Sequence, residues 1–240
     1  MEHLEALESH LNIVYDAFYR SVGIEESTGK VLGTNQRFSG KPYLGKLYPT
    51  AKKRILFIGM DIGADEGHHS FSSRRKAISS TENGIREIPY KKPFNPHISG
   101  TYAMSLALLY HDYKWDKIWR VFSSIKDRTA YRAIQVSHKI LPVDLLDLIS
   151  MTNLHKFVTI NRKNRSGSQD RNWKSPEVEL KLLKDEISIL KPNIIVIQSL
   201  GGNYLKNILD INKDVRVIVT AHPAARSRYY RSIAYIESLM

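Results

Sequence analysis

The first residues of the chain carry apolar side chains at alternating three- and four-residue steps. This spacing is that of one face of an α-helix, and it predicts an amphipathic helix that packs on a core. Residues 21–50 lose the period and are rich in Gly, Ser, Thr and Pro, so we expect an extended connection there. The apolar positions of the predicted helix are Leu4, Leu7, Leu11, Val14 and Phe18.

Short apolar runs farther along the chain have the length and composition of buried β-strands. A helical pattern from Ser175 to about Leu190 separates two of them, with a serine at the cap position and a proline at the first turn. Strands that alternate with helices are joined by crossovers and form a mostly parallel sheet. We therefore expect an α/β fold, a three-layer α/β/α sandwich with a central sheet of about four strands. The apolar runs cover residues 54–59, 148–153, 193–198 and 215–220.

The length of 240 residues favours one domain. We expect residues 1–240 to form it, with the helix and extended connection of residues 1–50 packed against the rest. Residues 72–98 and 162–174 are rich in lysine and arginine and are expected to be long basic loops.

The charge balance indicates a polyanionic partner. Lysine and arginine number 36 against 24 aspartates and glutamates, a formal net charge of +12. DNA, RNA, an anionic membrane surface and acidic substrates all fit this charge, and excess lysine for solubility alone is the alternative. The apolar fraction of 42% is that of a folded protein. The chain has no cysteine, which excludes disulfides, iron–sulfur clusters and thiol nucleophiles.

No stretch of about 18 apolar residues is present, so we expect no membrane partner. Glu2, Glu5 and Glu8 stand where a secretory signal would need positive charge. We expect a soluble, cytoplasmic protein that is a monomer.

Polar or glycine-rich segments follow all four predicted strands. Ligands of open parallel sheets bind in the crevice beyond the carboxyl ends of the strands, so these segments are expected to meet at one edge. The four segments are Gly59–Gly63, Asn153–Lys156, Gln198–Gly202 and Ala221–Arg226.

Three side chains in these segments suit the hydrolysis of an N-glycosidic bond. Asn153 can read a planar heterocycle through a paired donor and acceptor, and His222 can donate to an oxygen that becomes negative. Asp61 can orient water or stabilise a sugar cation. Taken singly, the residues also fit structural roles: a helix cap for Asp61, a turn for Asn153 and a buried core position for His222.

Other motifs are less well matched. The glycines after the first strand fit neither the dinucleotide-binding fingerprint nor the P-loop, and Ser199 lacks the G-x-S-x-G elbow of a hydrolase. His68 and His69 are adjacent, and adjacent histidines usually point apart, which disfavours a metal site. We expect no metal and no cofactor.

The order and spacing of these segments resemble the uracil-DNA glycosylase superfamily over about residues 50–236. The sequence G-M-D-I-G is similar to the first motif, G-x-[D/N]-P-[Y/G], with Ile62 in place of proline. The closest version is the G-M-N-P-G of the single-strand-selective monofunctional branch, which has asparagine at the position of Asp61. Asn153, with Lys156 three residues later, matches the second motif. The last motif, H-P-S before an intercalating loop, is present as H-P-A-A-R, with Ala224 replacing serine.

The resemblance implies a uracil-DNA glycosylase-like fold and a role for each matched residue. Asp61 would position water or stabilise the sugar cation, and Asn153 would read the edge of the flipped base. His222 would bind the pyrimidine O2. Phe71 is the first candidate for the aromatic that stacks on the base, with Tyr90 and Phe94 as alternatives. The implied base pocket also includes Met60 and Gly63.

Extruding a base costs a few kcal/mol, so the DNA backbone must be held by cations and backbone amides. The segment from Ser199 to Gly201 precedes a predicted helix whose first amides can bind a phosphate. Arg226 is the candidate for a side chain that wedges into the duplex. The expected DNA-binding residues are Lys156, Arg162, Lys163, Arg165, Ser199, Gly201, Arg226 and Arg228.

We expect a monofunctional glycosylase that removes a modified or damaged pyrimidine from DNA and leaves an abasic site. Gly63 stands where uracil-specific relatives place a tyrosine against the pyrimidine C5, so a larger C5 substituent could fit. Uracil, hydroxymethyluracil and the glucosylated 5-hydroxymethylcytosine of phage DNA are all candidates, in repair or in antiviral defence. A DNA-binding module that kept the scaffold and lost the reaction is the alternative, followed by an RNA-processing enzyme or nucleoside hydrolase.

Overall fold

The structure is a computed structural model of the chain. It describes residues 2–34, 36–60, 70–86, 101, 104–105, 108–109, 144–158, 176–199 and 202–222.

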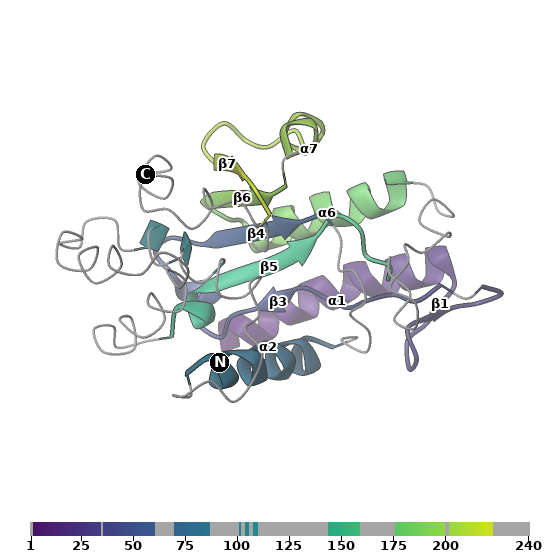
Figure 1. Cartoon of the computed structure of the whole chain (residues 1–240). Helices are drawn as coiled ribbons and strands as arrows, with labels where there is room; N and C mark the ends of the chain where they lie inside the picture. The colour runs from purple at the N-terminus through teal and green to yellow at the C-terminus, as the bar shows by residue number, and fades with distance from the viewer. Residues whose placement is uncertain are drawn as a thin grey trace, which may run out of the picture.

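A five-stranded sheet with the strand order β3-β5-β4-β6-β7 forms the centre of the fold (Figure 1). The last four strands in this order are parallel, and β3 pairs with β5 antiparallel at one edge. The expected α/β class with a mostly parallel sheet is therefore confirmed, with five strands instead of about four. The bounds are β3 Tyr43–Leu44, β4 Ile55–Gly59, β5 Ile149–Asn153, β6 Ile194–Gln198 and β7 Arg216–Thr220.

The strand order creates a switch point in the sheet. From β4 the chain moves to β5 on one side, whereas β6 and β7 lie on the other side of β4. In open parallel sheets, the crevice at the carboxyl ends beside such a reversal is where ligands bind. The topology therefore indicates that a ligand site would lie at the edge formed by the carboxyl ends of these strands.

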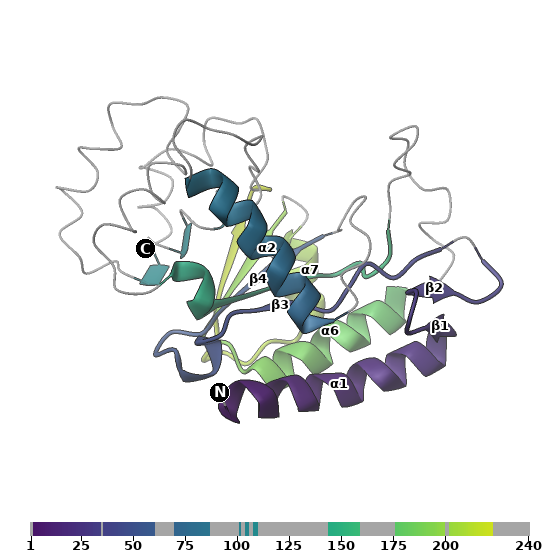
Figure 2. The ribbon, with the colours of Figure 1, turned by 90° about the horizontal axis from the view of Figure 1, so that it is seen from below.

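Two long helices cover one face of the sheet. α1 (Glu2–Val22) and α6 (Pro176–Leu190) lie side by side below it in Figure 2. Their apolar side chains pack on Leu56 and Ile58 of β4 and on the matching positions of β6. A shorter helix, α7 (Gly202–Ile208), connects β6 to β7 and packs on both strands.

The opposite face of the sheet is also covered. Ile55 and Val196 alternate with the residues that face α6, yet both are fully buried. Gln198 ends the same row, and its Nε2 atom donates to Thr101 Oγ1 at 2.9 Å. The central strands β4 and β6 are therefore buried on both sides, as their continuous apolar side chains predict.

A helix, α2 (Phe71–Arg86), replaces most of the first expected basic loop, so that prediction was wrong for residues 72–86. Ser70 Oγ accepts from the Ser73 amide at 3.1 Å and Ser73 Oγ accepts from the Ser70 amide at 3.2 Å, a reciprocal cap. Phe71 and Ile78, seven residues apart, are both buried. Residues 87–98 and the second expected basic loop, residues 162–174, lie outside the described residues.

The remaining described elements are short. Their bounds are β1 Ile24–Glu25 and β2 Lys30–Val31, which form a two-stranded sheet, and the 3₁₀ helices Tyr48–Thr50 and Leu145–Leu148. Within the described ranges, none of the helices has an apolar stretch that could cross a bilayer.

A cluster of aromatic side chains joins the second half of α1 to the segment before β3 and to the segment after β5. The ring of Tyr19 lies 5.1 Å from that of Phe38, and the rings of Phe18 and Phe157 are 6.0 Å apart, measured between centroids. Each such pair contributes about 0.5–1.5 kcal/mol beyond its buried area. The Tyr19 hydroxyl is buried and has no hydrogen-bond partner among the described residues. Burial, reinforced by Glu26 and Asp16, raises the pKa of Tyr19 well above its usual value.

We expect Tyr19→Phe to keep the wild-type stability near neutral pH or to raise it by up to about 1 kcal/mol, because the lost hydroxyl has no described partner. Above about pH 10 the unfolded tyrosine ionises while the folded one stays protonated, so the free energy of unfolding falls as pH rises. The variant should lose less stability than the wild type between about pH 8 and pH 11, measured by urea unfolding. Tyr204→Phe, at a position that is 70% exposed, is the control. A large loss at neutral pH would show that the Tyr19 hydroxyl is bonded.

Candidate functional site

The ends of β4 and β5 form the best-defined part of the candidate site. Gly59 and Asn153 are paired in register, and a Cβ atom at residue 59 would overlap the Oδ1 atom of Asn153. The Asn153 amide therefore lies directly against the glycine backbone. Only a residue without a side chain leaves this space to the amide.

The segments that follow β4 and β5 remain hydrogen-bonded to each other beyond the ends of these strands. The Leu154 amide donates to Gly59 O and the His155 amide donates to Met60 O, both at 2.9 Å. Met60 is half-buried and leads directly into Asp61. Asp61 and Gly63 lie outside the described residues. The loop after β5 is thus fixed next to the point where the chain leaves β4.

The segments that follow β6 and β7 lie along the same edge of the sheet. Gln198 is buried at the end of β6, and the half-buried Ser199 follows it. His222 follows β7 by two residues and is exposed. The ends of β5 and β7 are three strand spacings apart, roughly 14 Å. A ligand that contacts residues at both ends must therefore extend across the ends of β4 and β6.

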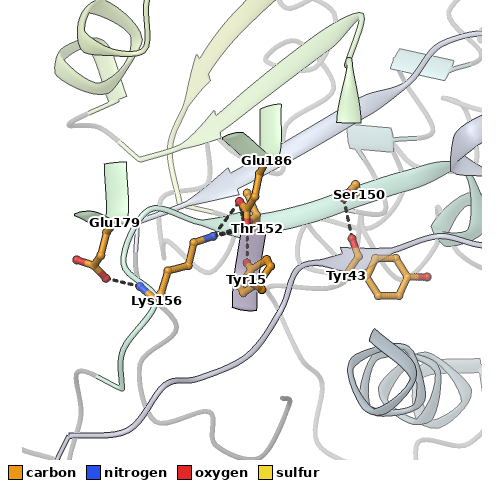
Figure 3. A network of polar contacts seen from close by, with 7 residues as sticks. All are labelled: Tyr15, Tyr43, Ser150, Thr152, Lys156, Glu179 and Glu186. Atoms are coloured by element: carbon orange, nitrogen blue, oxygen red, sulfur yellow. Dashed lines mark hydrogen bonds and ion pairs between the residues drawn. The ribbon is translucent and has the colours of Figure 1, made fainter. Parts of the chain in front are cut away.

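Lys156 does not belong to a DNA-binding surface, so that prediction was wrong. Its side chain is 1% exposed, and its Nζ atom donates to both carboxylate oxygens of Glu186, at 2.8 and 2.9 Å (Figure 3). A third bond, of 2.6 Å, goes to Thr152 Oγ1. All three protons of the ammonium group have acceptors, so none remains for a phosphate.

The Glu186 carboxylate joins three elements of the fold. It accepts from Lys156 and Thr152, and it accepts from the hydroxyl of Tyr15 on α1. Its own side chain is fully buried. Burial lowers the pKa of Lys156, an effect that the attraction of Glu186 opposes, and burial raises the pKa of Tyr15 well above its usual value. The pair is fully hydrogen-bonded, which a buried ion pair requires.

A second carboxylate of α6 holds the same loop. Glu179 Oε1 accepts from the Lys156 backbone amide at 2.5 Å, and its Oε2 atom lies 3.1 Å from His155 Nδ1. The Glu179 side chain is 7% exposed and that of His155 is 25% exposed. His155 was not among the predicted site residues. A histidine two positions after Asn153 was a visible signal, but the pairing with Glu179 across 24 residues was not.

Phe71 is unavailable as a stacking aromatic in this arrangement. Its ring is 5% exposed and belongs to the main core cluster. The ammonium group of Lys41 lies 5.5 Å from the ring centroid and donates to Asn12 Oδ1 at 2.5 Å. The structure thus contradicts the expected contact between this ring and a base. The alternatives, Tyr90 and Phe94, lie outside the described residues.

The remaining predicted DNA-binding residues are not described. They are Arg162, Lys163, Arg165, Gly201, Arg226 and Arg228.

Metal ligands do not gather in the part of the chain that the structure describes, since no group of three or more His, Asp or Glu side chains there has a suitable arrangement. No protein-family model matches the chain, and a search of the curated proteins finds no match either. The strand exits and their contacts are therefore the basis for a functional proposal.

The buried ion pair makes a testable contribution to stability. Glu186→Gln should lower the free energy of unfolding by about 3 kcal/mol, because it leaves the Lys156 ammonium without its counter-charge. The double variant Lys156→Met/Glu186→Gln should recover part of this loss, since it removes both charges. Urea unfolding measures all three proteins.

Asp185→Asn is the matched control on the same helix. Its carboxylate pairs with Lys181 at 3.0 Å on the exposed side of α6, where such a pair contributes only about 0.3–0.5 kcal/mol. Equal losses for Glu186→Gln and Asp185→Asn would contradict the central position given to Glu186.

Proposed function

We propose that the chain is a monofunctional DNA glycosylase that flips out a modified or damaged pyrimidine and hydrolyses its N-glycosidic bond. The observation that carries the proposal is the contact of the Asn153 amide with the Gly59 backbone, beside the segment that leads into Asp61. His222 follows another strand at the same edge of the sheet. An abasic site would be the product.

The proposed chemistry divides the charge of the transition state between two groups of residues. As the bond to the sugar breaks, the sugar becomes cationic and the departing base becomes anionic. Asp61 would stabilise the cation and orient water, while His222 would donate to the base oxygen. Asn153 would bind the base edge through its paired donor and acceptor.

The fold and the charge support a nucleic-acid substrate. The strand order puts a switch point beside the β4 end, and α/β proteins bind ligands beyond the carboxyl ends of the strands at such a point. A net charge of +12 favours a polyanion. The three-layer, uracil-DNA glycosylase-like arrangement is part of this proposal.

The expected substrate class depends on the segment that follows β4. By the resemblance, Gly63 would stand against the pyrimidine C5 atom, where the absence of a side chain would favour bases with a C5 substituent. We include uracil-type bases and glucosylated 5-hydroxymethylcytosine of phage DNA. The first would indicate a role in repair and the second a role in antiviral defence.

One observation favours a second candidate, a DNA-binding module that no longer excises bases. Phe71 and Lys156, two residues expected to contact DNA, are both buried. Such a module would bind DNA with a steep salt dependence and release no base.

A panel of duplexes and single strands tests the proposal. Each carries uracil, hydroxymethyluracil or glucosylated hydroxymethylcytosine, and alkali cleaves the abasic sites that form. We expect release of at least one base, and we expect Asp61→Asn and His222→Ala to slow it by about 10- to 1,000-fold while DNA binding is retained.

Asp210→Asn is the control, because Asp210 is exposed and lines a groove with Arg54 and Asn193, near the opposite ends of β4 and β6. DNA binding without release of any base would favour the inactive module. Cleavage of free nucleosides or RNA instead would indicate a different hydrolase. Unchanged rates in both site variants would contradict the assignment of Asp61 and His222.

The contact between Gly59 and Asn153 gives a second test. Gly59→Ala should displace the Asn153 amide and slow excision, whereas Asn153→Ala slows it by removing the amide. The two effects should not add in the double variant, because both act on the same group. Single-turnover excision rates complete this cycle, with circular dichroism to confirm folding. Additive effects would show that Gly59 acts independently of the amide.

A further inference from the structure

His155 forms a carboxylate–imidazole pair at the edge of the candidate site. Its Nδ1 atom lies 3.1 Å from Glu179 Oε2, and the other oxygen of that carboxylate is held by the Lys156 backbone amide. The carboxylate is therefore fixed by the same chain segment that carries the imidazole. A carboxylate that orients a histidine in this way is the arrangement found beside proton-transferring imidazoles.

The contact determines which nitrogen is available for proton transfer. An ionised carboxylate can only accept hydrogen bonds, so Nδ1 carries the proton that is shared with Glu179. In the neutral imidazole, Nε2 is then left with a lone pair. The side chain is 25% exposed, so part of the ring is accessible to solvent.

The position of His155 connects it to the other site residues. It follows Asn153 by two residues, and its backbone amide donates to Met60 O, one residue before Asp61. Of the charged groups nearby, the Lys156 ammonium is bound to Glu186, so Glu179 is the charged partner that the described structure gives to the imidazole.

We propose that His155 accepts the proton of the attacking water and that Glu179 is its positioning residue. The proposal rests on the proposed glycosylase activity. In the step, the water oxygen bonds to the anomeric carbon of the sugar while the water proton passes to His155 Nε2. The C–N bond breaks, its electron pair leaves with the base, and His222 stabilises the resulting anion by donating to it. The imidazolium then returns its proton to the base or to solvent.

Chemical rescue tests this role. His155→Ala should slow single-turnover excision by about 100-fold, the scale of general-base catalysis, and free imidazole should restore part of the rate. Glu179→Gln should also slow excision, and imidazole should not restore it because the His155 ring still fills its place. Asp185→Asn, on the exposed side of the same helix, should keep the wild-type rate.

Two results would overturn the proposal in this experiment. One is an unchanged excision rate for His155→Ala. The other is a slow, correctly folded His155→Ala protein that imidazole does not accelerate, because this would assign a purely structural role to the ring.

A second measurement does not depend on excision. Diethyl pyrocarbonate acylates accessible neutral imidazole nitrogens, and peptide mass spectrometry locates the product. We expect His155 to react, Glu179→Gln to change its rate, and bound DNA to protect it. His10, which is exposed on α1, is the internal reference. An unreactive His155 beside a reactive His10, or a His155 that DNA does not protect, would overturn the inference. A reactive and protected His155 in a protein that releases no base would instead reject the glycosylase proposal while supporting an accessible basic nitrogen at the DNA site.

Discussion

The ion pair between Lys156 and Glu186 is the contact on which the described site depends. It joins the segment after β5 to α6, and the Tyr15 hydroxyl brings α1 into the same network. Removing two charges from water costs several kcal/mol per ion, which only close geometry and complete hydrogen bonding can offset. Both conditions are met here, because all three ammonium protons and both carboxylate oxygens have partners. The pair therefore restricts the loop after β5 to one position relative to the helices.

This restriction extends to the residues proposed to act on a substrate. The Lys156 backbone amide is held by Glu179, and the preceding amides of Leu154 and His155 donate to the chain that leaves β4. Asn153 thus stands between a regular strand and a segment that is anchored on two sides. An amide that reads a base edge must keep its direction before the base arrives, because ordering it during binding would reduce affinity. The network holds the backbone that carries this amide from the side of α6.

Regular elements followed from the sequence wherever one physical signal dominated. The four parallel strands begin and end within one residue of the predicted runs. In β4 and β6 the reason is that a strand buried on both faces needs continuous apolar side chains. β3 has only two residues, too few for any pattern, and the polar composition of α2 concealed its serine cap. The site was harder to predict because charge is visible in a sequence and burial is not. Lys156 has the formal charge of a DNA-binding residue, but its acceptor comes from Glu186, 30 residues away.

The buried pair also separates attraction from chemistry in the proposed enzyme. The opposite charges of Lys156 and Glu186 lie 2.8 Å apart and neutralise each other. The pair therefore adds no net charge to the long-range field that attracts a polyanion to the protein. The excess positive charge must therefore act through other side chains, which salt screens when they are exposed. Of the groups proposed for bond cleavage, His155 is held instead by hydrogen bonds to Met60 and Glu179, and Asn153 packs on Gly59. Salt screens such short-range contacts much less than it screens the attraction of exposed charges. Ionic strength should then govern how often DNA is bound, while the rate of cleavage in the bound state depends on the geometry of the sheet edge.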